Sequence, residues 1–271
     1  MPSIDIGPKQ IHYWVGRRSP SEGREVVLFI HGAGGGENVW NYQKAFFERQ
    51  FHPLIIELSG HGKSEGEGEQ EIGRYAEEVH RFLNAMGLSR VTLVGHSMGG
   101  AIVQTLVLTH PEMIDRIVLV ATGARLEVSP ILLNGLQHHL KETVRKIAQS
   151  AYSRKAPPGL IEEGISELMR SRPEVLYGDL LACDRFDLMN EIEKVDLPTL
   201  ILCGEEDQLT PVAFSEFLHL RMRHSKIEVL PNAGHMVMIE SAQTFNEKVG
   251  SFIANELKGS KECQTISRSA G

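Results

Sequence analysis

One stretch of this sequence, RVTLVGHSMGGAIVQTLVL at residues 90–108, joins a short apolar run to a longer one through a serine flanked by glycines. The run 91–94 is typical of a buried strand, and the segment 101–108 is typical of a helix. A side chain at Gly95 or Gly99 would collide with neighbouring backbone as the chain reverses around Ser97. The G-x-S-x-G pattern at a strand-to-helix turn presents a serine hydroxyl on a sharp, strained bend. We therefore predict that Ser97 is a nucleophile.

Further apolar runs indicate a buried, mainly parallel α/β sheet. They alternate with stretches of helical periodicity, of which residues 71–86 and 241–257 are the clearest. Such alternation is typical of βαβ units, whose strands are covered by helices on both faces and are therefore continuously apolar. An antiparallel hairpin over residues 4–6 and 10–15 opens the sheet. The runs predicted as strands after the hairpin are residues 26–30, 54–58, 91–94, 117–120, 199–203 and 227–230.

A long segment separates the fourth and fifth of these runs. It covers residues 123–195 and contains helical patterns that Pro157, Pro158 and Pro173 break apart. Connections in α/β units usually have only a few residues, so we interpret this segment as a helical cap inserted over the carboxyl edge of the sheet. The core then comprises residues 1–122 and 196–257. The polar tail, residues 258–271, is predicted to be poorly ordered.

Two short segments offer a base and an acid for the serine. His235 follows the last predicted strand, in Asn232-Ala233-Gly234-His235, and Asp207 follows the fifth run, in the stretch GEEDQLTP at residues 204–211. The chain order serine, aspartate, histidine is that of α/β-hydrolases. From residue 26 to about residue 257, the chain resembles α/β-hydrolase-fold enzymes. The resemblance implies an eight-stranded, mainly parallel sheet with the cap inserted after the sixth strand.

The resemblance also implies a role for each side chain. Ser97 is then the nucleophile, His235 the general base and later the acid, and Asp207 the carboxylate that holds the imidazole tautomer. Asp207 is favoured because the family pattern G-x-x-D-x-x-x-P is met, with Gly204 and Pro211 in place. The competing acids are Glu205, Glu206, Asp184 and Asp187.

The loop His31-Gly32-Ala33-Gly34-Gly35-Gly36 follows the run 26–30 and resembles the oxyanion loop of the same family. Backbone amides in this loop, together with the amide of Met98, would face the negative charge of a tetrahedral intermediate. We expect the N–H groups of Ala33 and Met98 to be the donors, with Gly34 as the alternate to Ala33.

A serine nucleophile implies an acyl-enzyme pathway that requires no cofactor. The expected activity is that of a carboxylic ester hydrolase on small or medium apolar esters or lactones, acyl-homoserine lactones included. Hydrolysis of C–C bonds in ring-fission products, cofactor-free perhydrolysis and a ligand-binding receptor with weak turnover are the alternatives. Flexible apolar side chains in the cap suit an acyl pocket. Candidate substrate-binding residues are Trp40, His96, Leu126, Leu136 and Met189, with packing as the competing interpretation for each.

Composition narrows the class of partner. The chain has 271 residues, 41% of them hydrophobic, and its net charge of −7 is interspersed, which disfavours nucleic acid as a partner. It begins with no signal pattern and has no segment long enough to cross a bilayer, so we expect a cytoplasmic protein.

Two other kinds of site are disfavoured by spacing. The cysteines form no C-x-x-C pair and the histidines no H-x-x-x-H arrangement, so no metal site is expected. The segment Gly60-His61-Gly62-Lys63-Ser64 looks like a phosphate-binding loop, but Glu57 stands where its first glycine should be. It resembles instead the D-x-x-G-x-G-x-S turn of α/β-hydrolases, with Glu57 in place of the aspartate. The sequence does not indicate the oligomeric state.

Overall fold

The computed structural model describes residues 2–17 and 24–269, with side chains as far as residue 255. It contains an eight-stranded sheet in the order β1-β2-β4-β3-β5-β6-β7-β8. Strand β2 pairs antiparallel with β1 and β4, and the other pairs are parallel, which confirms the expected mainly parallel sheet and its opening hairpin. The strands are β1 (Ser3–Ile6), β2 (Lys9–Val15), β3 (Val26–Ile30), β4 (His52–Ile56), β5 (Val91–His96), β6 (Ile114–Val120), β7 (Thr199–Gly204) and β8 (Ser225–Leu230).

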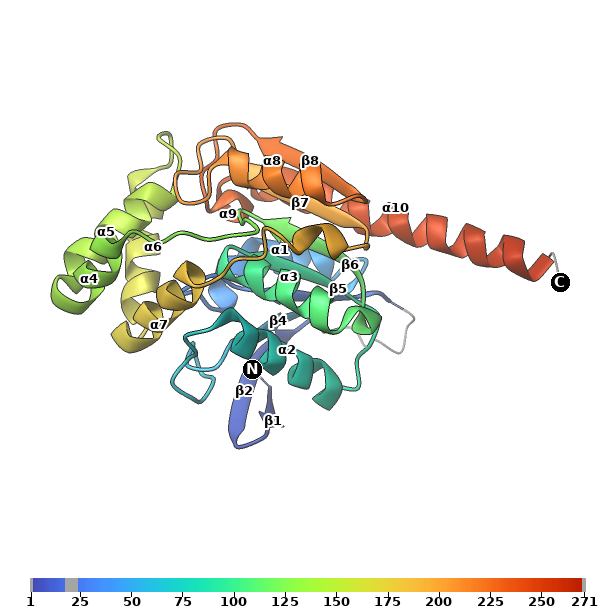
Figure 1. Ribbon diagram of the computed structural model, residues 1–271, viewed down its shortest axis with the longest axis horizontal. Coiled ribbons are helices and arrows are strands. Elements are labelled where there is room, and N and C mark those ends of the chain that lie inside the picture. The colour runs from blue at the N-terminus through green and yellow to red at the C-terminus, as the bar shows by residue number, and fades with distance from the viewer. Residues whose placement is uncertain (1, 18–23, 270–271) are drawn as a thin grey trace.

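Helices cover both faces of the sheet (Figure 1). The helices α2 (Ile72–Ala85), α3 (Met98–Thr109) and α8 (Val212–Arg221) pack on one face, and α1 (Asn41–Phe47), α9 (Val237–Glu240) and α10 (Ala242–Ser269) pack on the other. Strand side chains alternate between the faces: Leu28 points to the first and Phe29 to the second. Each such fully buried apolar side chain contributes about 1.5–3 kcal/mol, so both layers stabilise the sheet that positions the loops at its carboxyl edge.

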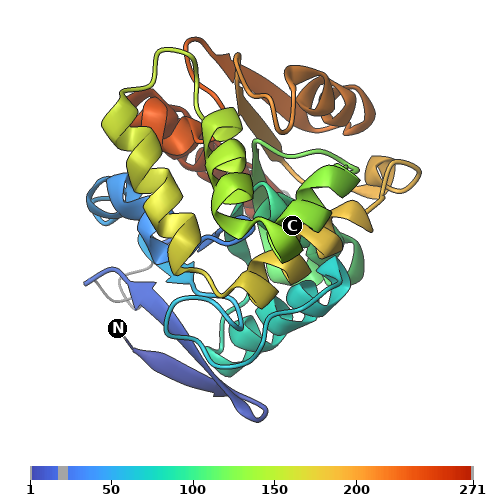
Figure 2. The ribbon, with the colours of Figure 1, turned by 90° about the vertical axis from the view of Figure 1, so that its left-hand side faces the viewer.

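The residues between β6 and β7 form a helical insert, as the sequence predicts. It contains α4 (Pro130–His138), α5 (Leu140–Ala151), α6 (Pro158–Arg170) and α7 (Pro173–Asp184). Figure 2 shows these four helices, green to yellow, gathered at one side of the molecule. They share a small apolar core of Leu136, Val144, Ala148, Ile165 and Leu176. The cap therefore has an apolar core of its own beside the two layers of the sheet.

The last helix is longer than the sequence predicts. We expect its end at residue 257, whereas α10 continues to Ser269. Residues 258–269 contain one glycine and no proline, so no strong helix breaker interrupts it. The poor order expected for residues 258–271 stays a prediction, and residues 270–271 lie outside the described part. Within the described ranges, none of the helices combines the length and apolar character that a membrane span requires.

Candidate active site

Ser97 lies on a strained turn between β5 and α3. Its φ of 53° and ψ of −116° lie where residues other than glycine are rarely found, at a cost of about 1–3 kcal/mol. A Cβ at Gly95 would lie 2.3 Å from the carbonyl oxygen of Gly99, and one at Gly99 would lie 2.4 Å from that of Ile30. Both glycines are therefore required by close backbone approach, as the sequence predicts.

His235 and Asp207 meet at the carboxyl edge of the sheet, after β8 and β7. The Nδ1 of His235 lies 2.9 Å from the Oδ2 of Asp207. The other oxygen of Asp207 accepts hydrogen bonds of 2.9 Å from the backbone N–H groups of Leu209 and Thr210. Burial raises the pKa of Asp207, but His235 and the hydrogen bonds from Thr210 outweigh burial, and this pKa lies below its ordinary value. The carboxylate is therefore held ionised beside the imidazole.

The competing acids have other partners. Glu206 accepts a hydrogen bond from the backbone N–H of Arg154, and Asp184 accepts one from that of Val128. Among the described residues, Asp207 is the carboxylate within hydrogen-bonding distance of the His235 ring.

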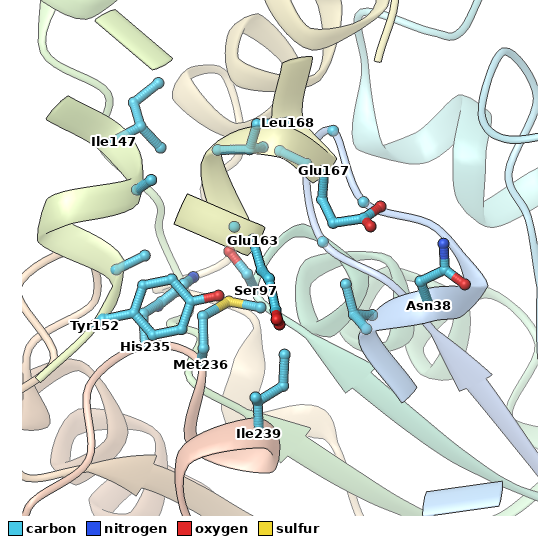
Figure 3. A pocket seen from close by; sticks show the side chains of 18 of the residues that line it. Asn38, Ser97, Ile147, Tyr152, Glu163, Glu167, Leu168, His235, Met236 and Ile239 are labelled. Atoms are coloured by element: carbon cyan, nitrogen blue, oxygen red, sulfur yellow. The ribbon is translucent and has the colours of Figure 1, made fainter. Parts of the chain in front are cut away.

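Ser97 and His235 line one cavity between the cap and the core, with a volume of about 670 Å³ (Figure 3). The core contributes the loop from Gly32 to Gly35, and the cap contributes α5 and α6. Most of the remaining wall is apolar. It includes Val39, Ile147, Leu160, Leu168, Leu176, Leu180, Leu209, Met236 and Ile239.

The loop after β3 lies against the nucleophile. A Cβ at Gly32 would lie 3.1 Å from the Cβ of Ser97. The N–H of Gly34 is engaged, because it donates to the Oδ2 of Asp179 over 2.8 Å. The N–H groups of Ala33 and Met98 make no hydrogen bond within the part of the chain that the structure describes. Ala33 and Met98 therefore remain the candidate oxyanion donors, and Gly34, the alternate, has a different partner.

A buried polar network behind this loop was not predicted from the sequence. Asp179, on α7, is fully buried and also accepts hydrogen bonds from the Nε2 of His61, over 2.8 Å, and from the hydroxyl of Tyr75, over 2.6 Å. Burial lowers the pKa of His61, but the charge and hydrogen bond of Asp179 outweigh burial and raise it above its ordinary value. The cap and the core thus share a charged contact directly behind the loop.

His31 fixes the start of the same loop. Its Nδ1 lies 2.9 Å from the carbonyl oxygen of Gly32, and its Nε2 accepts the backbone N–H of Leu58. Burial, together with the nearby His61, lowers the pKa of His31 to about 3, so its ring is neutral. Nearby, Glu57 accepts the backbone N–H of Lys63 over 2.9 Å, which shows that the glutamate can hold this turn.

Of the five candidate substrate-binding residues, His96 alone lies on this cavity. Trp40 is fully buried against Phe29, and Leu126 belongs to the core layer on the α2 and α3 side. Leu136 is part of the cap core, and Met189 lines a separate cavity of about 310 Å³. Apolar residue type alone does not distinguish a side chain that lines a cavity from one that packs a core. The sequence therefore could not separate these four residues from those that line the cavity.

His96 has a structural contact as well. Its Nε2 lies 3.1 Å from the carbonyl oxygen of His235, and the two rings are 4.7 Å apart. Burial, together with the neighbouring His235, lowers the pKa of His96 to about 3. A neutral His96 therefore holds the backbone of His235, because its Nε2–H donates a hydrogen bond to the carbonyl oxygen.

Comparison with known proteins agrees with this fold. A model of the alpha/beta hydrolase family matches residues 27–248. The chain belongs to the alpha/beta hydrolase family. It is 26% identical to 3-oxoadipate enol-lactonase 2 of Acinetobacter baylyi over 83% of this chain and 87% of that protein. It is 28% identical to the 2-hydroxy-6-oxononadienedioate/2-hydroxy-6-oxononatrienedioate hydrolase of a Pseudomonas species, over 93% and 95% of the two chains. A solved thermophilic esterase superimposes with a TM-score of 0.83 at 32% identity, over 94% and 97% of the chains.

Proposed function

We propose that this alpha/beta hydrolase cleaves carboxylic esters through an acyl-enzyme formed on Ser97. The observation that carries the proposal is the His235–Asp207 pair, 2.9 Å between Nδ1 and Oδ2, on a cavity that also receives the strained Ser97. A serine hydroxyl is a weak nucleophile until an oriented base takes its proton. Strained backbone is retained where function depends on it.

In the proposed reaction, the Oγ of Ser97 attacks the carbonyl carbon while the Nε2 of His235 takes the hydroxyl proton. Asp207 holds the Nδ1–H and stabilises the imidazolium that forms. The N–H groups of Ala33 and Met98 receive the oxyanion, and the loss of one such donor typically costs about 3–4 kcal/mol. His235 then donates its proton to the leaving alcohol. A water molecule, deprotonated by the same ring, hydrolyses the acyl-serine and restores the enzyme.

The cavity supports a small or medium apolar acyl group. Its volume of about 670 Å³ lies in the range usual for small-molecule sites, and most of its wall is apolar. Esters and lactones, acyl-homoserine lactones included, are the substrates that we propose. The likeness to an esterase and to an enol-lactonase supports the same class of reaction.

A panel of 4-nitrophenyl esters of increasing acyl length, with simple and acyl-homoserine lactones, tests the proposal. Ser97→Ala is the blank, and Ser166→Ala is the matched control because Ser166 lines the same cavity from α6. We expect hydrolysis by the wild type and by Ser166→Ala, and a loss of about a thousandfold or more in Ser97→Ala. Turnover no higher than that of Ser97→Ala across the panel would contradict the proposal.

Two other reactions use the same three side chains, and a ligand-binding receptor is the third alternative. Hydrolysis of a C–C bond in a vinylogous diketone and formation of a peracid from peroxide are each identified by product analysis. A receptor with an unassembled site would react slowly or not at all with a fluorophosphonate, whereas the proposed hydrolase reacts rapidly.

A further inference from the structure

One wall of the cavity carries nearly all its charged side chains. Besides the two histidines, the charged residues that line it are Glu162, Glu163, Glu167 and Arg170, all on α6. Helix α6 lines the same cavity as Ser97, so an acyl group bound in this cavity lies beside this wall (Figure 3).

Three of these four charges are neutralised in pairs. Glu162 pairs with Arg145 at 2.9 Å, and Glu167 pairs with Arg170. Glu163 makes no ion pair with any residue that the structure describes, and its carboxylate points into the cavity in Figure 3. The wall therefore presents one uncompensated negative charge to the substrate.

The charge of Glu163 acts on the cavity wall. Tyr152 lines the cavity on the same side as Glu163 (Figure 3). Burial, together with the charges of Glu240 and Glu163, raises the pKa of Tyr152 to about 12. A group that opposes a negative charge on the phenol also opposes one on a bound substrate.

We propose that Glu163 selects substrates by charge: neutral and cationic acyl groups are accepted, and acyl groups that carry a carboxylate are disfavoured. This inference rests on the proposed ester hydrolysis and deepens it, because it names the charge class of the substrate. Repulsion within a cavity is screened less than repulsion between exposed charges, so an effect of about tenfold is expected at low ionic strength.

Three esters of matched length test this inference. They are the 4-nitrophenyl esters of hexanoic acid, of 6-(trimethylammonio)hexanoic acid and the mono-ester of adipic acid, compared by kcat/KM at low and high salt. Glu163→Gln removes the charge. Glu174→Gln is the matched control, because it removes an exposed negative charge of the cap that does not line the cavity.

We expect the wild type to prefer the cationic to the anionic ester by about tenfold at low salt. We expect Glu163→Gln to remove most of this preference, and Glu174→Gln to keep it. An unchanged preference in Glu163→Gln would overturn the inference. Calorimetric binding of the corresponding amides to Ser97→Ala and to Ser97→Ala/Glu163→Gln makes the same comparison without turnover. Failure of ester hydrolysis is thereby distinguished from failure of charge selection.

A separate cluster, remote from this cavity, joins α2 to the end of α3. The rings of His80, on α2, and His110, directly after α3, stack with centroids 3.6 Å apart and planes 16° apart. Glu77, one turn before His80, lies beside both rings: its Oε2 is 3.6 Å from the Nδ1 of His80 and 3.9 Å from the Nε2 of His110. One donor atom from each of the three residues thus lies within 4.8 Å of the others.

The second atom of each group has its own partner. The Nε2 of His80 lies 2.9 Å from the amide of Asn84, and the Nδ1 of His110 lies 3.8 Å from the Oε1 of Glu112. Arg81 holds the Oε1 of Glu77. The Nδ1 of His80 is shielded from solvent and makes no hydrogen bond within the described residues. The Nε2 of His80 faces the amide nitrogen of Asn84, and the two rings lie nearly parallel. For both inner nitrogens to bind one ion, the Asn84 amide has to turn its oxygen toward an Nε2–H and the stacked rings have to turn from their present planes.

We infer that Glu77, His80 and His110 bind a divalent transition metal ion such as Zn²⁺. Imidazole and carboxylate are ligands that zinc takes in tetrahedral sites, and solvent would supply the fourth ligand. Because the ligands come from α2 and from the end of α3, binding would stabilise the packing of these two helices. No local spacing pattern indicates this site, because His110 lies thirty residues from His80 in the chain.

Calorimetric titration with Zn²⁺ alone and thermal unfolding test this site without reference to activity. We expect one site of about micromolar affinity that raises the unfolding temperature, weakened about tenfold or more in His80→Ala and His110→Ala. His138→Ala, which removes an exposed histidine of the cap, is the control and is expected to keep the site. Zn²⁺ binding that is absent in the wild type, or unchanged in folded His80→Ala and His110→Ala, would overturn the inference.

Discussion

The backbone N–H of Gly34 donates a hydrogen bond of 2.8 Å to the carboxylate of Asp179, so a helix of the cap holds the loop that follows β3. Ala33, whose N–H we propose as an oxyanion donor, directly precedes Gly34. The position of this donor therefore depends on a carboxylate that is far away in the sequence and fully buried.

Removing the charge of Asp179 is expected to lower both stability and activity. Asp179→Asn leaves three donors, from Gly34, His61 and Tyr75, facing a neutral amide with one acceptor oxygen. We expect a loss of about 1–3 kcal/mol in the free energy of unfolding by urea, with a fall in kcat/KM as the loop shifts. Glu174→Gln, exposed on the same helix, is the control. If Asp179→Asn behaved like Glu174→Gln, the network would have no role.

The pair of His61 and Asp179 is expected to weaken as the pH rises. The pKa of His61 in the folded protein lies above its ordinary value of 6.5 because Asp179 outweighs the effect of burial. Its stabilisation is therefore complete below pH 6.5 and is lost as the pH rises through the folded value. Urea unfolding from pH 6 upward should show a steeper loss in the wild type than in His61→Gln. Parallel curves for the two proteins would contradict this prediction.

Asp207 has the opposite pH dependence. Its folded pKa lies below the ordinary value of 3.8, so the stability it contributes is present above pH 3.8 and is lost as the pH falls through the folded value. Wild type should lose more stability on acidification than Asp207→Asn. At neutral pH, we expect Asp207→Asn to reduce kcat by about 10⁴-fold, because the amide favours the wrong tautomer of His235. A loss below about tenfold would show that another group orients the ring.

Because the backbone at Ser97 is strained, replacing this serine with glycine should raise the stability of the protein and abolish its activity. Ser97→Gly is expected to raise the free energy of unfolding by about 1–3 kcal/mol, because glycine adopts the φ of 53° without strain. Ser97→Ala keeps the side-chain constraint and should not be stabilised in this way, and neither variant should hydrolyse esters. Equal unfolding free energies for the two variants would argue against strain at this position.

The parts of the site that lie in local turns are predictable from the sequence. The glycines around Ser97, the segment before Asp207 and the segment before His235 each lie at the end of a predicted strand, and parallel strands bring such ends to one edge of the sheet. Contacts between the cap and the core cannot be predicted from local sequence patterns. Gly34 and Asp179 lie 145 residues apart, and no local pattern marks the aspartate as a partner of the loop.

Some residues predicted to line the cavity do not line it, and others line it without having been predicted to, for one physical reason. Trp40 and Leu136 are apolar candidates for the substrate pocket, but both are buried in packed cores. Conversely, Glu163 and Tyr152 line the cavity although their residue types gave no reason to place them there. Which side chains of an element face a cavity depends on how the elements pack together, and the sequence of one element does not determine it.

In the proposed mechanism His235 and Asp207 activate Ser97, and reaction with a fluorophosphonate followed by peptide mass spectrometry measures this activation at Ser97 itself. We expect rapid, stoichiometric modification at Ser97 in the wild type and in Ser166→Ala, and a rate lower by about a thousandfold or more in folded His235→Gln. Failure to modify Ser97, or an equal rate of modification in His235→Gln, would show that His235 and Asp207 do not activate this serine.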